Sequence, residues 1–290
     1  MFLTQLVHGI TLGACYALIA LGYSMVYGII GLINFAHGDI YMVGSFLALY
    51  FVTVPKLHVS VAFLLSMAIT SLLGMLIERI AYKPLRKSGR LSPLISAIGV
   101  SIFLSTFVNM IKGPQTRGFP EVIKEIEFSI AGVRITSLEL YVMAMSVVLM
   151  LVLQYIVQKT RVGQAMRATS YDKDVAALMG IDVDRIIALT FAIGSALAAA
   201  SGVMMGIYFN ACWPLMGFMA GLKAFTAAVL GGIGSIPGAV VGGLFLGVVE
   251  ILGTAYLASS YRDAISFTIL ILVLLVKPSG LLGRRIEQKV

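Results

Sequence analysis

The sequence predicts an all-α protein, a polytopic bundle of transmembrane helices with about eight to nine spans. Of its 290 residues, 59% are hydrophobic and only 12% are charged, whereas an average soluble domain has about 25% charged residues. The mean hydropathy is +0.99, and the apolar residues stand in long continuous runs. So few charged side chains cannot cover a water-soluble domain of this length, which excludes an ordinary soluble enzyme, a disordered chain and a disulfide-rich secreted module.

The distribution of apolar and basic residues excludes two further classes. A transmembrane β-barrel would alternate polar and apolar residues, but here Leu, Ile, Ala and Met follow one another without alternation. The formal net charge is +8, yet the bases lie in short loops between apolar runs, as on the cytoplasmic side of membrane proteins. We therefore expect a lipid bilayer, and no nucleic acid, as partner. Residues 1–9 contain no Lys or Arg, so we expect no cleavable signal peptide.

Eight apolar runs reach or approach the length of a membrane span, which is about 20 residues. A ninth stretch, 217–235, is apolar but dense in glycine, so we expect it to cross, to re-enter or to form a broken helix. The eight predicted spans cover residues 6–29, 40–54, 59–81, 93–111, 137–158, 186–208, 237–257 and 264–277. We expect all of them to belong to one transmembrane domain, residues 1–290.

Basic residues predict which loops face the cytoplasm. The loops 82–92 and 159–185 and the C-terminal tail after 276 are rich in Lys and Arg, so all three are expected to be cytoplasmic. The loop 112–136 mixes bases with three glutamates and is expected to be external. No charge decides the side of the N-terminus, and the sequence does not fix the number of spans.

The first interruption of the apolar pattern is the segment 28–39, in which three glycines surround Asn34, His37 and Asp39. Non-helical backbone at membrane depth is tolerated only inside protein or along a wet cavity, and broken helices often build substrate sites in transporters. The alternative interpretation is a plain cytoplasmic turn in which Asn34 caps the next helix. The pattern alone leaves both open.

The second interruption is 217–238, where glycines and Pro237 make one straight helix difficult. Lys223 lies in this stretch and Glu250 in the middle of the next span. Ionisable residues inside a membrane are functional candidates, but Lys223 could also snorkel to an interface, and the two could form a structural ion pair. The expected substrate-passage residues are Asn34, His37, Asp39, Lys223, Thr226 and Glu250.

The cytoplasmic loop 159–185 predicts a structure of its own. Asp172 can cap a short helix over 173–179, and Gly180 suits the left-handed residue that ends it. Such a helix could rest on its own bundle or on lipid headgroups, or it could dock into a cytoplasmic partner. If it docks, the coupling residues are expected to be Arg167, Asp172, Ala176, Leu178 and Gly180.

Five runs of the sequence are similar to one known family, the permease subunits of bacterial branched-chain amino acid ABC importers. The resemblance extends from residue 16 to about residue 283, and its most specific parts are Asn-Phe-Ala-His-Gly at 34–38 and the glycine-rich run 223–239. The runs are 16–23, 26–31, 33–38, 178–181 and 223–239.

This resemblance implies a transport subunit of the bacterial inner membrane that is not itself an enzyme. It implies four kinds of partner: two cytoplasmic ATP-binding subunits, a second homologous permease, a periplasmic amino-acid-binding protein and the bilayer. It also implies that 172–180 rests on an ATPase. The chain has no G-x-x-x-x-G-K-[ST] phosphate loop, so ATP is expected on the partner chains and no cofactor on this one.

Three alternatives remain at the level of sequence. A related ABC permease for urea, an amide or another small polar solute would look alike. A secondary transporter or channel would need a coupling-ion site or selectivity ring, for which Asp39, Glu78 and Glu250 are few and scattered. A membrane enzyme has little support, because the three histidines lie far apart, no H-E-x-x-H run occurs and neither cysteine lies in a metal-binding pattern.

Overall fold

The computed structural model describes residues 2–86, 88–89, 91–130 and 133–283, and most of them are helical. Short turns of π- or 3₁₀-helix follow α3 at Glu78–Tyr82 and Lys83–Leu85 and precede α11 at Ser259–Tyr261. The helices are α1 (Phe2–Ile30), α2 (His37–Thr53), α3 (Val59–Ile77), α4 (Leu91–Lys112), α5 (Ser137–Lys159), α6 (Arg161–Tyr171), α7 (Lys173–Leu178), α8 (Val183–Tyr208), α9 (Met216–Gly231), α10 (Ile236–Tyr256) and α11 (Arg262–Val276).

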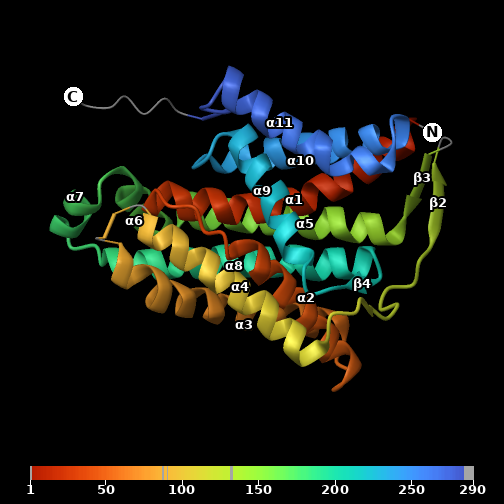
Figure 1. Ribbon diagram of the computed structural model, residues 1–290, viewed down its shortest axis with the longest axis horizontal. Helices are drawn as coiled ribbons and strands as arrows, with labels where there is room; N and C mark the ends of the chain where they lie inside the picture. Colours follow the sequence, from red (N-terminus) through yellow and green to blue (C-terminus); the bar gives the residue numbers. More distant parts are fainter. Residues whose placement is uncertain (1, 87, 90, 131–132, 284–290) are drawn as a thin grey trace.

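The long helices run between two distinct ends of the molecule (Figure 1). The end that carries α6 and α7 is here called the α7 end, and the opposite one the strand end. At the strand end, β1 (Arg117–Gly118) pairs with β4 (Ala211–Cys212), and β2 (Glu127–Ile130) pairs with β3 (Val133–Thr136), both antiparallel. The predicted external loop 112–136 therefore contains three short strands, which sequence patterning did not indicate.

Seven of the described helices are long and apolar enough to cross a membrane: α1, α3, α4, α5, α8, α10 and α11, counting the short turns next to α3 and α11. The one remaining predicted span, 40–54, corresponds to α2, which has 17 residues and a length of about 25 Å. The glycine-rich stretch contains α9, with 16 residues. The polytopic helical bundle is thus confirmed. The tail beyond Gly283, predicted to be cytoplasmic, lies outside the described residues.

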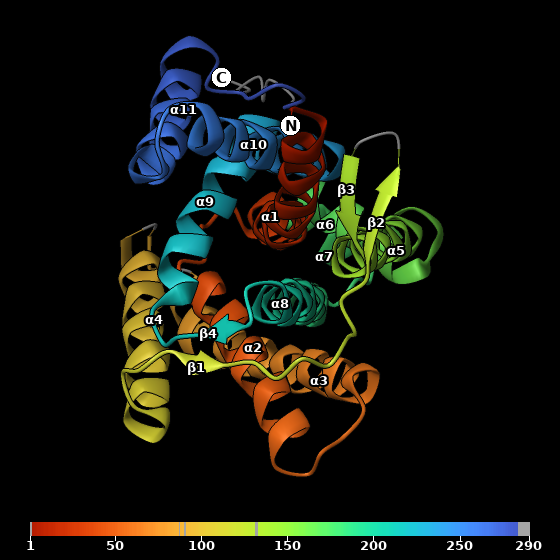
Figure 2. The ribbon, with the colours of Figure 1, turned by 90° about the vertical axis from the view of Figure 1, so that its right-hand side faces the viewer.

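Two helices, α1 and α8, form the centre of the bundle (Figure 2). Helices α3, α4, α5, α10 and α11 surround them, and α4 and α11 expose most of their apolar side chains. Exposed apolar helix faces are stable in a bilayer, where the helix satisfies its own backbone hydrogen bonds. The arrangement therefore has a protein-covered core and a lipid-facing outer ring.

Small residues allow α1 and α10 to touch along their backbones. Gly9 and Gly13 on α1 are spaced like Gly243 and Gly247 on α10, one every four residues. A Cβ added to Gly247 would lie only 2.3 Å from the Cα of Gly13. Such small-xxx-small contacts bring membrane helices close enough for extensive van der Waals packing, so any larger side chain there would push the two helices apart.

Both predicted interruptions are breaks between helices, and the second is shorter than expected. Residues 31–36 separate α1 from α2, whereas α9 continues through Gly231 and only 232–235 separate it from α10. Gly232 and Gly234 have φ angles of +104° and +90°, which side chains with a Cβ rarely adopt. The chain reverses there, and the Ser235 hydroxyl accepts the Gly238 N–H at the start of α10.

Candidate functional site

The first break and the start of α2 bring three predicted residues into one buried group. Asn34, His37 and Asp39 are each at most 2% exposed. The Asn34 carboxamide oxygen accepts the Tyr82 hydroxyl at 3.0 Å and the Ala36 N–H at 3.1 Å, and the Asp39 carboxylate accepts the Ser101 hydroxyl. The cap position of α2 is Ala36, so the alternative in which Asn34 is the N-cap residue is wrong by two residues.

His37 lies deep between helices because α1 has a glycine opposite it. A Cβ on Gly22 would lie 2.3 Å from Nε2 of His37, and the ring of Tyr23 meets the imidazole edge-on, with centroids 4.8 Å apart. Among the described residues, neither His37 Nε2 nor the Asn34 amide nitrogen has a hydrogen-bond partner. Buried polar atoms without partners are costly, so these two atoms make the group a candidate functional site.

The N-terminal ends of α2 and α9 meet beside this group. A Cβ on Gly38 would lie 2.3 Å from the carbonyl oxygen of Gly217, so the two helix backbones are in contact. Helix N-terminal ends carry partial positive charge and unpaired N–H groups. Two such ends meeting inside a membrane protein are typical of broken-helix transport sites.

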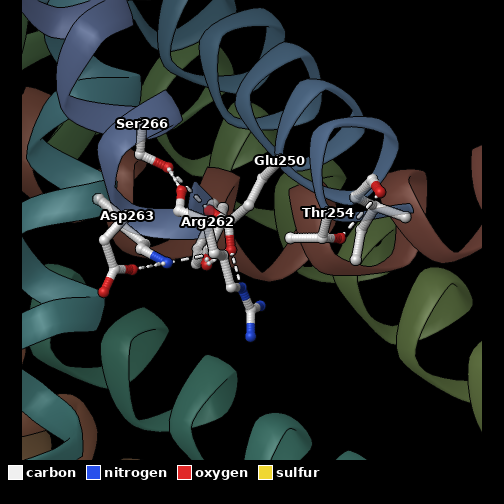
Figure 3. Close-up of polar contacts among 8 residues, drawn as sticks. Glu250, Thr254, Arg262, Asp263 and Ser266 are labelled. Atoms are coloured by element: carbon white, nitrogen blue, oxygen red, sulfur yellow. Dashed lines mark hydrogen bonds and ion pairs between the residues drawn. The ribbon is translucent and has the colours of Figure 1, made fainter. Parts of the chain in front are cut away.

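The second group of predicted residues surrounds the carboxylate of Glu250, which is fully buried on α10 (Figure 3). Lys223 of α9 lies 3.0 Å from it and also pairs with Asp263 at 2.8 Å. Arg262 of α11 donates to the same carboxylate through Nε, and the hydroxyls of Tyr16 and Ser266 donate to it at 3.0 Å. This group is here called the Glu250 cluster. The formal charges of Lys223, Arg262, Glu250 and Asp263 in it sum to zero.

This geometry decides between the alternatives for Lys223. Its side chain is 6% exposed and bound to two carboxylates, so it does not snorkel to an interface. A buried charge is tolerated only when it is paired and hydrogen-bonded, and here each of the two buried charges, Lys223 and Glu250, has at least two partners. The cluster joins α1, α9, α10 and α11 at one point.

The structure therefore divides the predicted passage residues into two groups and one single residue. Asn34, His37 and Asp39 form the first, and Lys223 and Glu250 belong to the second. Thr226 is buried, but its hydroxyl donates to the carbonyl of Leu222 in its own helix at 2.9 Å, and it joins neither group. Among the residues the structure describes, no three His, Cys, Asp or Glu side chains gather as metal ligands.

The sequence did not indicate six hydrogen-bond or ion-pair partners of these groups. Tyr82, Arg262, Asp263 and Ser266 stand at or near the borders of predicted spans, whereas Ser101 and Tyr16 lie inside spans and resemble ordinary packing residues. The spacing of Arg262 and Ser266, four residues apart on one helix face, is the signal that could have linked the start of α11 to Glu250.

The predicted short helix in the 159–185 loop is present as α7. The Asp172 carboxylate accepts the N–H groups of Asp174 and Val175, and Gly180 follows the helix with φ +81°. Ala176 is buried, whereas Leu178 is 86% exposed. The sequence did not indicate α6, in which Arg167 contacts the carbonyl of Val157 in α5.

One contact links α7 to the membrane helices, and a second links the turns after α3 to the start of α8. The ammonium of Lys173 donates to the carbonyl of Ile30 at 3.1 Å, which is the last residue of α1 before the first break. Arg86 contacts Glu78 and pairs with Asp184 at 2.7 Å. Burial lowers the pKa of both Lys173 and Arg86; the Arg86 charge lowers that of Lys173 further, whereas Asp184 opposes the fall for Arg86.

Comparison with known proteins shows similarity over the full chain. The family described as "Branched-chain amino acid transport system / permease component" matches residues 5–274. The chain is 48% identical to the high-affinity branched-chain amino acid transport system permease protein LivH of Escherichia coli (strain K12) and 47% identical to BraD of Pseudomonas aeruginosa, covering all of this chain and 98% of each relative. A probable permease of the same kind from Methanocaldococcus jannaschii is 30% identical, covering 92% of this chain and 88% of the relative.

Proposed function

The chain belongs to the family of permease components of branched-chain amino acid transport systems, and from this we propose that it forms the membrane passage of an ATP-driven importer of leucine, isoleucine and valine. The observation that carries the proposal is nearly half identity along the whole length to permeases of that substrate class. The permease works with a second homologous permease, two ATP-binding subunits and a periplasmic binding protein, in the bacterial inner membrane.

The surface proposed to receive an ATPase is α7. Val175, Leu178 and Met179 are 54%, 86% and 78% exposed, on a helix that is fixed at its start by Asp172. Short rigid apolar surfaces of this kind suit a groove in a partner protein. Because Lys173 holds the end of α1, a displacement of α7 by the ATPase pulls directly on the first helix break.

The proposed passage opens between α2 and α9. Gly38 and Gly217 are in close backbone contact, which would keep such a passage closed, and Asn34, His37 and Asp39 would offer polar groups beside it. On the α9 side, Lys223 and Thr226 are proposed to face the passage, and Glu250 of α10 to hold Lys223 in place. Separation of α2 and α9 would free backbone N–H groups for a substrate carboxylate and polar side chains for its ammonium.

Reconstitution tests the proposed function. The purified chain alone in liposomes should carry no leucine down a gradient, whereas the complex with its partner permease, ATPases and binding protein should take up leucine only with ATP. Gradient-driven uptake by the lone chain would contradict an ABC permease. Preferential uptake of urea or an amide by the complex would assign a different substrate class.

The docking surface has its own test. Leu178→Glu should leave the permease folded and abolish ATP-dependent uptake, because a charge replaces the exposed apolar residue of α7. The matched control is Ser129→Glu, which adds the same charge at an exposed position of β2, far from α7, and should transport normally. Wild-type uptake by Leu178→Glu would mean that α7 is not the contact.

A further inference from the structure

A second feature at the strand end is not used by the proposed passage. A cavity of about 340 Å³ opens there between the start of α1, the ends of α8 and α10 and the residues around the start of α11. Small-molecule sites have volumes of roughly 300–1,000 Å³. Six of its lining residues are His8, Leu12, Phe209, Ile251, Thr254 and Arg262.

Arg262 gives this cavity a defined charge. Its Nε contacts Glu250, while Figure 3 shows the end of the guanidinium turned away from that carboxylate. Among the described residues, Nε is the only guanidinium nitrogen of Arg262 with a hydrogen-bond partner. Its Cζ lies 6.0 Å from the centre of the Phe209 ring, and the side chain is 36% exposed. A guanidinium with its fork free can hold a carboxylate through two parallel hydrogen bonds.

The neighbouring acids do not compete for that fork. Glu250 is 0% exposed and is held by Tyr16, Lys223 and Ser266 as well as by Arg262. Glu139, which is 1% exposed, contacts His8 and accepts the N–H of Thr136. Asp263, next to Arg262 in the sequence, pairs with Lys223 at 2.8 Å, and the lining residues of the cavity include no carboxylate.

The rest of the lining suits the other parts of an aliphatic amino acid. Helices α8 and α10 end at Tyr208 and Tyr256, close to the cavity, and helix C-terminal ends carry partial negative charge that attracts a cation such as an ammonium group. Leu12, Ile251 and the ring of Phe209 supply apolar wall. Carboxylate, ammonium and side chain each have a matching surface.

We propose that this cavity is a receiving site, where a free aliphatic α-amino acid first binds the permease with its carboxylate on the guanidinium of Arg262. The proposal rests on the proposed function, because it assumes that the chain handles amino acids at all. Under the orientation in which the α7 end is cytoplasmic, the site faces outward. The substrate reaches it before α2 and α9 separate.

Thiol protection in the whole complex tests this site. Thr254→Cys places a small thiol in the cavity wall, and the native Cys15 and Cys212 are buried. Leucine at about ten times its Kd should slow labelling of Thr254→Cys by a water-soluble thiol reagent about tenfold. Leucine amide, which lacks the carboxylate, should give little protection. The matched control, Ser60→Cys at the exposed start of α3, should label equally fast with and without leucine.

Arg262 is tested in the same background. Arg262→Lys keeps the positive charge beside Glu250 but loses the fork, so leucine protection of Thr254→Cys should weaken strongly while the protein stays folded. Equal protection by leucine and leucine amide, or full protection in Arg262→Lys, would overturn the assigned role of Arg262. If leucine does not slow the labelling of Thr254→Cys in a complex that still takes up leucine, the receiving site is wrong and the proposed function stands. Failure of the wild-type complex to take up leucine would instead overturn the proposed function.

Discussion

Gly38 is the residue at which the closed passage leaves no room for a side chain. The Cβ of Gly38→Ala would lie 2.3 Å from the Gly217 carbonyl oxygen and 2.8 Å from the Cα of Gly221. Both neighbours are backbone atoms, so α2 and α9 must separate to admit it. Overpacking of this kind costs about 1–3 kcal/mol, and we expect Gly38→Ala to lower the unfolding temperature of the purified permease and to impair uptake.

The matched control for that prediction is Gly99→Ala. Gly99 lies on the exposed side of α4 with no other atom within 4 Å of an added Cβ. Alanine favours a helix over glycine by about 1 kcal/mol, so this variant should be as stable as wild type or slightly more stable. Equal unfolding temperatures for the two variants would contradict the close packing of α2 on α9.

Cys212 is predicted to be chemically inert in the folded protein. Burial raises the pKa of its thiol to about 11, although the nearby Ser45 hydroxyl lowers it slightly. The thiolate is the reactive form, and at a pH three units below the pKa only about one thiol in a thousand is ionised. Maleimide labelling near pH 8 should therefore be undetectable before denaturation by detergent, and it should rise as the pH approaches 11. Rapid labelling of Cys212 itself in the folded chain near pH 8, located by peptide mass spectrometry to separate it from Cys15, would show that Cys212 is accessible.

Individual site residues could be predicted from the sequence only where the residue type is rare in its surroundings, such as a charged residue in an apolar run. Lys223 and Glu250 were identified because charges inside apolar runs are rare, and their pairing was a possibility that the structure confirms at 3.0 Å. Tyr82 and Ser101 were not identified, because their partners Asn34 and Asp39 lie 48 and 62 residues away. No local pattern encodes such contacts, which arise only when the helices pack.

At the scale of elements, α11 depends on a few polar contacts. It exposes most of its apolar side chains, and its first turns supply three members of the Glu250 cluster, Arg262, Asp263 and Ser266. Apolar packing holds a membrane helix to its neighbours less strongly than in water, because lipid is equally apolar. The cluster is therefore a main anchor of α11.

Removal of the central carboxylate should release this anchor. Glu250→Ala leaves Lys223 and Arg262 without their shared partner, and breaking a buried ion pair in this way costs about 3–5 kcal/mol. We expect a large fall in unfolding temperature and faster proteolysis between α10 and α11. Ser266→Ala, which removes one hydrogen bond, should cost only about 1 kcal/mol. A similar small effect for both variants would mean that apolar contacts alone hold α11.

Elements were predictable where local chemistry defines their ends. Asp172 and Gly180 mark both ends of α7, and the caps are as the sequence predicts. The helix α6 was missed because Arg161–Tyr171 is polar and amphipathic, so neither a hydropathy run nor a glycine or proline border identified it. The second break was predicted too long, because packing against neighbouring helices keeps α9 helical through its glycines.

At the scale of the whole molecule, hydropathy locates the apolar helices along the chain but not their positions in the bundle. The most hydrophobic window of α1 has a mean hydropathy of 1.6 and is 89% buried, whereas that of α5 has a mean hydropathy of 2.3 and is 22% buried. In a bilayer, lipid-facing and protein-facing surfaces are both apolar. The amino-acid composition of a helix therefore does not show whether the helix is buried in the bundle or faces lipid. Only the small residues and the rare charges indicated which faces lie inside.

The sidedness of the N-terminus, which the sequence left open, follows from the fold once one end of the bundle is assigned. The last residue of α1, Ile30, is bound by Lys173 at the α7 end, so the first residues of this 29-residue helix lie at the strand end. Lys83 and Arg86 pair with Asp184 at the start of α8, where the chain leaves α7, and loops rich in such bases face the cytoplasm. The strands and the start of α1 should then face outward.

Cysteine labelling from each side of the membrane checks this orientation. Ser129→Cys on β2 and Ser170→Cys on α6 replace exposed serines at opposite ends. An impermeant thiol reagent should label Ser129→Cys in spheroplasts and Ser170→Cys only in inside-out vesicles, because the bilayer separates the two positions by the length of the helices. The native cysteines are buried and provide an unlabelled background. The reverse pattern would place α7 outside, where no ATPase could reach it, and would contradict both the orientation and the proposed docking surface.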